Sequence, residues 1–206
     1  MRKLWHILFL GLMLAPGVVR AATLGEAQIG FTADRTLVID GRTYRGKIWT
    51  MPGRERHEQA IQGFRPVFLL RADSPLAEIV LPQLKTIVQF ELPQELRILG
   101  TQALKKHPVG RETVNGIATT KYAIDETVQE GRAAGTLWLS RDGIPMRVAG
   151  SFTAQKGKVS TVSWELSRVR IGPQPASLFD PPQGFSKLPP EAIAPLLGLK
   201  LKSPPR

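Results

Sequence analysis

The sequence predicts a mainly β protein with some helix, an α+β fold built on one strongly curved antiparallel sheet, an open half-barrel. Three observations lead to this fold class. Apolar and polar residues alternate at a period of two along several segments, turns containing Gly or Pro separate these segments, and one helical pattern interrupts them. A long meander of this kind must curve to cover its apolar face, and we expect the helix to pack on it.

The N-terminus carries the pattern of a secretory signal peptide. Arg2 and Lys3 form a basic start, and the segment from Leu4 to Leu14 is apolar. Cleavage after Ala21 would place the aliphatic Val19 three residues before the cut. A transmembrane anchor is the alternative, but the apolar run is shorter than the roughly 20 residues that span a bilayer. We therefore expect a cleaved signal and a periplasmic location.

Composition narrows the class of protein. The 206 residues, 42% of them hydrophobic, can bury a core, and one main domain is the default. The chain has no cysteine, which excludes disulfides, thiolate metal sites and a cysteine-anchored lipid. Its formal net charge of +11 favours anionic partners. Because we expect export, an anionic membrane surface is a candidate partner and nucleic acid is not.

The first half of the chain contains five strand patterns. The segment Leu37 to Ile39 ends at Asp40-Gly41, a dipeptide typical of tight hairpins, and Thr43 to Met51 resumes the extended pattern. The continuous apolar run from Val67 to Leu70 predicts a strand covered on both faces. Two further strands are predicted at 77–81 and 86–92.

One helix is predicted at residues 93–106. Pro93 suits the first helical position, and Pro108 prevents continuation. Apolar residues recur at helical spacing and basic residues occupy the last turn: Leu92, Leu96, Leu99 and Ala103, then Lys105, Lys106 and His107.

The second half returns to strand patterns, at 116–127, 135–140, 144–155 and 159–171. In the last of these, Val162, Trp164 and Leu166 share one side, whereas Val169 and Ile171 fall on the other. This change of parity predicts a bulge or a strand that crosses between sheets.

A proline-rich stretch, Pro173 to Pro190, follows these strands. It carries Leu178, Phe179 and Phe185, and we expect it to lie over the sheet. The domain would therefore occupy residues 22–190, after the signal peptide at 1–21. We expect residues 191–206 to form a flexible tail.

No motif of an enzyme occurs in the sequence. His57 and His107 have no second histidine at metal-ligand spacing, and a solvated structural histidine is the expected role of each. There is no nucleophile elbow, phosphate-binding loop or dinucleotide-binding glycine pattern. We therefore expect no catalytic residue, no metal and no cofactor.

Two groups of residues are candidates for binding. Aromatic residues in the predicted strands either fill the core or line a lipophilic pocket: Trp49, Phe68, Phe90, Tyr122, Trp138 and Trp164. Basic residues cluster between 42 and 56 and form either a solvated hairpin face or a rim for an anionic headgroup: Arg42, Arg45, Lys47, Arg54 and Arg56.

Several motifs, read in order, resemble those of a known family. They are Gly46-Lys47-Ile48-Trp49, Pro52 to Glu58, Val109 to Gly116, Gly135 to Ser140 with Asp142 to Pro145, and Ser177 to Pro182. This series resembles uncharacterised periplasmic domains of the LolA/LolB-like lipoprotein-carrier superfamily, related to outer-membrane lipoprotein sorting. The resemblance implies an incomplete antiparallel barrel, wrapped on helices, with an apolar cavity for acyl chains.

Two functions therefore remain open. The first is a binding or carrier protein for lipid, lipoprotein acyl chains or another lipophilic ligand at the cell envelope. The second is an interaction or sensor scaffold of the envelope that uses the same fold and binds a protein partner, because fold alone does not determine function. An enclosed apolar cavity would distinguish the first from the second.

Overall fold

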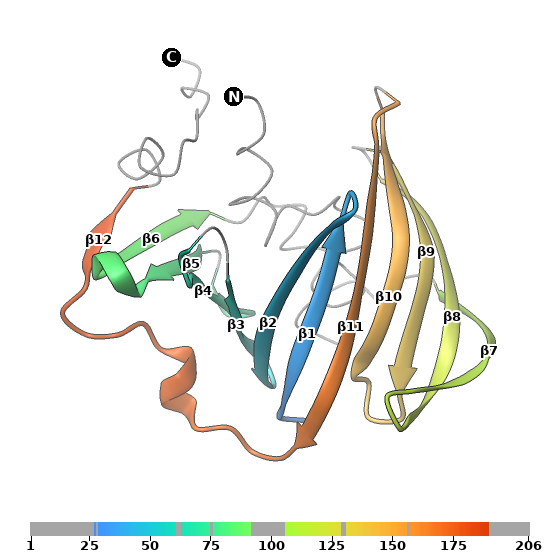
Figure 1. Ribbon diagram of the computed structural model, residues 1–206, viewed down its shortest axis with the longest axis horizontal. Coiled ribbons are helices and arrows are strands. Elements are labelled where there is room, and N and C mark those ends of the chain that lie inside the picture. The colour runs from blue at the N-terminus through green and yellow to red at the C-terminus, as the bar shows by residue number, and fades with distance from the viewer. Residues whose placement is uncertain are drawn as a thin grey trace.

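The described part of the protein is one strongly curved β-sheet (Figure 1). The computed structural model describes residues 27, 29–60, 63–74, 76–91, 106–128, 131–155 and 157–189. These residues form a sheet of twelve strands in the order β12-β6-β5-β4-β3-β2-β1-β11-β10-β9-β8-β7. All neighbours are antiparallel except β12 and β6. The strands β12 and β7 are the two edges, so within these residues the sheet is open.

The strands have the following bounds: β1 Phe31–Ile39, β2 Arg42–Met51, β3 Arg54–Gln59, β4 Val67–Arg71, β5 Leu76–Leu81, β6 Thr86–Glu91, β7 Lys106–Val114, β8 Ile117–Val128, β9 Gly131–Ser140, β10 Pro145–Ala154, β11 Val159–Ile171 and β12 Ser186–Leu188. Two short 3-10 helices, η3 (Pro82–Leu84) and η4 (Ala176–Phe179), accompany them.

The curved antiparallel sheet that the sequence predicts is confirmed, including two local features. Asp40 and Gly41 both have positive φ, as a two-residue hairpin turn between β1 and β2 requires. The predicted bulge lies in β11 at Arg168, which also has positive φ, and the register shifts there opposite Thr32 and Asp34 of β1.

Two elements differ from the prediction. β3 was not expected, because its sequence, RERHEQ, contains no apolar residue. Lys106 and His107 belong to β7 rather than to the last turn of a helix. The rest of the predicted helix, residues 93–105, lies outside the described residues, as do the signal peptide and the tail at 191–206. Since the described ranges contain no α-helix, the packing of a helix on the sheet is not supported.

One face of the sheet carries a continuous apolar cluster. In β1, every second residue from Phe31 to Ile39 is buried, and the strand register extends the same face across β11, β10, β9 and β8. This cluster, the inner apolar cluster, consists of Leu37, Ile39, Ile124, Ala133, Leu137, Leu139, Val148, Phe152, Val162 and Trp164. Burial of these side chains is the main term that stabilises the sheet.

Glycines show that the sheet bends toward this apolar face. Gly46, Gly135 and Gly150 hold register positions on it. A Cβ at Gly135 would lie 2.5 Å from the carbonyl oxygen of Ala149, and one at Gly46 would overlap the carbonyl oxygen of Glu58. Such an approach requires that the neighbouring strand is tilted toward this face. The apolar face is therefore concave, and we call it the inner face and the opposite one the outer face.

The proline-rich stretch covers part of the outer face. Phe179 of η4 is buried beside β3, and Phe185 packs against four apolar residues of β4, β5 and β6: Val67, Leu69, Val80 and Ile87. β12 then pairs with β6. The prediction that this stretch lies over the sheet is confirmed. It also explains why β4 is buried on both faces.

The first prediction concerns the curvature of the sheet. Gly150→Ala would place a Cβ 2.7 Å from the carbonyl oxygen of Ala134, which belongs to backbone and cannot rotate away. We expect a loss of about 1 to 3 kcal/mol in the free energy of unfolding, measured in urea. Gly110→Ala is the control, because its Cβ would meet nothing within 4 Å. Equal stability of both variants and wild type would contradict the bend.

Candidate functional site

A buried polar cluster interrupts the apolar inner face. It consists of Arg35 on β1 and three residues of β3: Glu55, His57 and Gln59. All four side chains are buried, and Arg35 is only 7% exposed. We call these four residues the inner polar cluster. Ionisable residues are rarely buried to this extent without a specific partner.

A glycine on β2 allows the two strands to meet. β2 lies between β1 and β3, and Gly46 is the register partner of both Arg35 and Gln59. Because Gly46 has no side chain, the Arg35 side chain can cross β2 and reach β3. The same absence of a Cβ allows β3 to bend inward, so curvature and cluster have one origin in the sequence.

Hydrogen bonds fix the proton positions in the cluster. A guanidinium group only donates, so the 2.9 Å contact between Arg35 Nη1 and His57 Nδ1 makes Nδ1 an acceptor. The proton of the neutral ring is then on Nε2, which donates to Glu55 Oε2 at 2.8 Å. Arg35 Nη2 donates to Gln59 Oε1 at 3.0 Å. His57 therefore links the guanidinium to the carboxylate.

Burial determines which side chains of the inner polar cluster are charged at neutral pH. Desolvation lowers the pKa of Arg35 to about 10, although Glu55 opposes this effect, so the group stays cationic at neutral pH. Desolvation also lowers the pKa of His57, with a further contribution from the positive charge of Arg35. At neutral pH the cluster thus contains one cation and one carboxylate, separated by an uncharged imidazole.

The inner face has further polar groups. The hydroxyls of Tyr44 and Thr50, both on β2, are buried and have no hydrogen-bond partner among the described residues. Tyr44 pairs in register with Leu37, and Thr50 pairs with Glu55. The inner face thus combines buried apolar side chains with a buried cation and two hydroxyls. An amphiphile that displaced the groups covering this face would gain binding energy from the apolar area and orientation from the polar groups.

The predicted aromatic residues are divided between the two faces. Tyr122 and Trp164 lie on the inner face and belong to or pack against the inner apolar cluster. Phe68 is buried on the inner face of β4, on the other side of β1 from that cluster. Phe90 holds a register position in β6 opposite Ala77.

The other two aromatic residues, Trp49 and Trp138, lie on the outer face and not on the face of the inner apolar cluster. Trp49 is in register with Arg56, and Lys47 Nζ is 5.3 Å from the centroid of its ring. Trp138 is in register with Arg147. Both alternate with inner-face residues along their strands, so they cannot face inward.

Four of the five predicted rim residues come together on the outer face of β2 and β3. These residues, the outer basic strip, are Arg45, Lys47, Arg54 and Arg56, and the cations of Lys47 and Arg56 lie over the ring of Trp49. Arg54 forms an ion pair with Asp180 at 3.2 Å, and Arg56 forms one with Glu58 at 2.6 Å. Arg42 is exposed at the turn and shares the register of the inner face.

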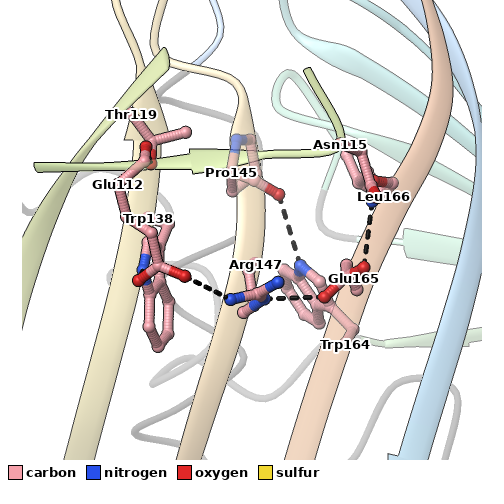
Figure 2. A network of polar contacts seen from close by, with 9 residues as sticks. All are labelled: Glu112, Asn115, Thr119, Trp138, Pro145, Arg147, Trp164, Glu165 and Leu166. Atoms are coloured by element: carbon pink, nitrogen blue, oxygen red, sulfur yellow. Dashed lines mark hydrogen bonds and ion pairs between the residues drawn. The ribbon is translucent and has the colours of Figure 1, made fainter. Parts of the chain in front are cut away.

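Trp138 belongs to a polar network on the outer face (Figure 2). Its Nε1 donates to Glu112 Oε2 at 2.7 Å, and Arg147 donates to Glu112 at 2.9 Å and to Glu165 at 2.6 Å. Asn115, in the turn between β7 and β8, also donates to Glu165 at 2.9 Å. The network joins the β7–β8 hairpin to β9, β10 and β11, which is a structural role.

Arg35, Glu55 and Gln59 were not among the residues predicted from the sequence, and His57 is buried rather than solvated. A signal was present, because Arg35 occupies an otherwise apolar position in the alternation from Phe31 to Ile39. In the described ranges no three His, Cys, Asp or Glu side chains gather to hold a metal ion. No helix in them is long and apolar enough to cross a membrane.

The fold is similar to solved structures that share little sequence with this chain. An uncharacterised conserved protein from Thermus thermophilus matches with a TM-score of 0.54 at 13% identity, over 79% of this chain and 91% of that one. A chain of the MucA/MucB complex of Pseudomonas aeruginosa matches at 0.47 and 17% identity, over 80% of this chain and 58% of that one.

The matches also include a LolA superfamily protein from Nitrosomonas europaea, with a TM-score of 0.43 and 10% identity, over 80% of this chain and 96% of that one. This chain spans less than two thirds of the length of the matched Pseudomonas chain. No protein-family model and no curated protein matches the sequence.

The second prediction follows from the lowered pKa of His57. The unfolded chain binds a proton at this histidine below about pH 6.5, while the folded chain resists it, so the free energy of unfolding falls as the pH drops through this range. His57→Gln removes this contribution and flattens the decline below about pH 6.5 in urea unfolding. His107→Gln, at an exposed histidine of β7, is the matched control. An unchanged slope in His57→Gln would contradict the assignment.

Proposed function

We propose that this chain is an exported envelope protein that binds or carries a lipophilic ligand, such as a lipid or a lipoprotein acyl chain, on the inner face of its sheet. The observation that carries this proposal is the inner apolar cluster, which extends over β1 and β8 to β11 without a break. The signal-peptide pattern at residues 1–21 supports export.

The shape and chemistry of the inner face support an acyl ligand. An acyl chain makes no hydrogen bonds, so it requires apolar surface, and its burial contributes about 25 cal/mol for each Å² removed from water. The bend at Gly46, Gly135 and Gly150 turns this surface into a concave one. The motifs that resemble LolA/LolB-like carriers point to the same class of ligand.

Binding fits the inner polar cluster better than catalysis does. His57 and Glu55 are hydrogen-bonded to each other, and His57 also accepts from Arg35, so both ring nitrogens of the imidazole are occupied. A general base needs a nitrogen that can take a proton from a substrate.

An interaction or sensor scaffold is the second candidate function. The outer basic strip favours it, because Arg45 and Lys47 are exposed and Lys47 lies over the ring of Trp49. Such a surface suits an anionic membrane or an acidic segment of an envelope protein. The two functions use opposite faces of the sheet, and an experiment can separate them.

The third prediction uses the positions of the tryptophans. Titration with a lysophospholipid or a long-chain fatty acid should give a saturable change in tryptophan emission, because Trp164 lies in the inner apolar cluster. Trp164→Phe should abolish most of this change while affinity, measured by calorimetry, is largely retained. Trp49→Phe is the matched control on the outer face, and this variant should keep the change in tryptophan emission.

The absence of saturable binding would favour the scaffold. A change in emission that Trp49→Phe abolishes and Trp164→Phe keeps would place the ligand on the outer face. Mass spectrometry of lipids extracted from gently purified protein would then identify the natural ligand class.

A further inference from the structure

We propose that Arg35 anchors the anionic headgroup, a carboxylate or a phosphate monoester, of a long-chain amphiphile whose tail lies on the inner apolar cluster. This inference rests on the proposed function and specifies its ligand. It assigns to this site a charged, single-headed amphiphile in preference to a neutral lipid.

The charge of Arg35 is balanced within the inner polar cluster by Glu55, but no carboxylate bonds to it directly. Its two described acceptors, His57 Nδ1 and Gln59 Oε1, are both uncharged. Its guanidinium forms no ion pair with a carboxylate among the described residues, since Glu55 is bonded to the far side of the His57 ring. A buried cation normally requires a directly bonded anion, and here the direct contacts are neutral.

Arg35 also has N–H donors in excess of the acceptors that contact it. A guanidinium has five N–H groups in a planar fork, and the contacts within the described chain engage Nη1 and Nη2 once each. The remaining N–H groups can bind the two oxygens of a carboxylate or a phosphate in the bidentate geometry for which arginine is suited. The hydroxyl of Tyr44 occupies the inner-face position next to Gly46 on β2 and is a further candidate donor.

The last consideration is the position of Arg35 relative to the apolar surface. On β1 the next inner-face residue after Arg35 is Leu37, followed by Ile39, and both belong to the inner apolar cluster. From β1 this cluster continues over four strand spacings to β8, which is about 19 Å. A headgroup at Arg35 therefore places the tail along these side chains, which are at most 7% exposed, so the tail binds there only by displacing the groups that cover them.

The experiment compares ligands on the unaltered protein, so that it does not depend on the folding of a variant. Palmitic acid, hexadecanol, palmitoyl lysophosphatidic acid and palmitoyl lysophosphatidylcholine compete with a fluorescent fatty acid at pH 8. We expect the acid or the phosphate monoester to bind about tenfold or more tightly than hexadecanol, as hydrogen bonds to a charged partner imply. The stronger of these two identifies carboxylate or phosphate as the headgroup.

A matched set of variants then locates the effect. Arg35→Gln should reduce the preference for the anionic ligand to near unity while hexadecanol still binds, and Arg35→Lys should restore part of it. Arg45→Gln, in the outer basic strip, is the control and should keep the full preference.

The outcomes separate the two proposals. Equal affinity for palmitic acid, the phosphate monoester and hexadecanol would overturn the headgroup assignment and leave the lipophilic site intact. No binding of any of the four would overturn the proposed function itself. A preference for the anionic ligand that Arg45→Gln abolishes would move the headgroup site to the outer face. If Arg35→Gln does not fold, the comparison of ligands on the wild type still decides.

Discussion

The inner polar cluster depends on the hydrogen bonds of one buried guanidinium, that of Arg35. Arg35 lies in the middle of an apolar alternation on β1, and its hydrogen bonds reach past β2 to His57 and Gln59 on β3. This contact is available only because Gly46 presents no side chain between them. The same position lets β3 tilt toward the inner face. One residue type at one position thus supports both the curvature of the sheet and the polar cluster within its concave surface.

Much of the fold could be predicted because its strands are amphipathic and its turns are local. The Asp40-Gly41 hairpin and the bulge in β11 depend on neighbouring residues and are visible in the sequence. β3 could not be found this way, since its inward residues are Glu55, His57 and Gln59, which are buried through hydrogen bonds and not through hydrophobicity. A method based on apolar periodicity cannot detect such a strand.

The site was harder to predict because its members lie on different strands. Trp49 and Trp138 are aromatic residues in strands, but their partners on the same face are Lys47, Arg56 and Arg147, supplied partly by other strands. Their outward direction follows from register, which the sequence alone does not specify. As a result, cations lie over the tryptophan rings on the outer face, while the inner apolar cluster and Arg35 occupy the inner face.

The inner face is the surface on which we propose that the ligand binds. Photo-crosslinking with a long-chain fatty acid that carries a diazirine in its tail, followed by peptide mass spectrometry, tests this proposal most directly. We expect adducts on inner-face residues of β9, β10 and β11, such as Leu137, Phe152 and Val162, and competition by unlabelled palmitic acid. Adducts confined to the outer basic strip around Trp49, or labelling that palmitic acid does not displace, would contradict it.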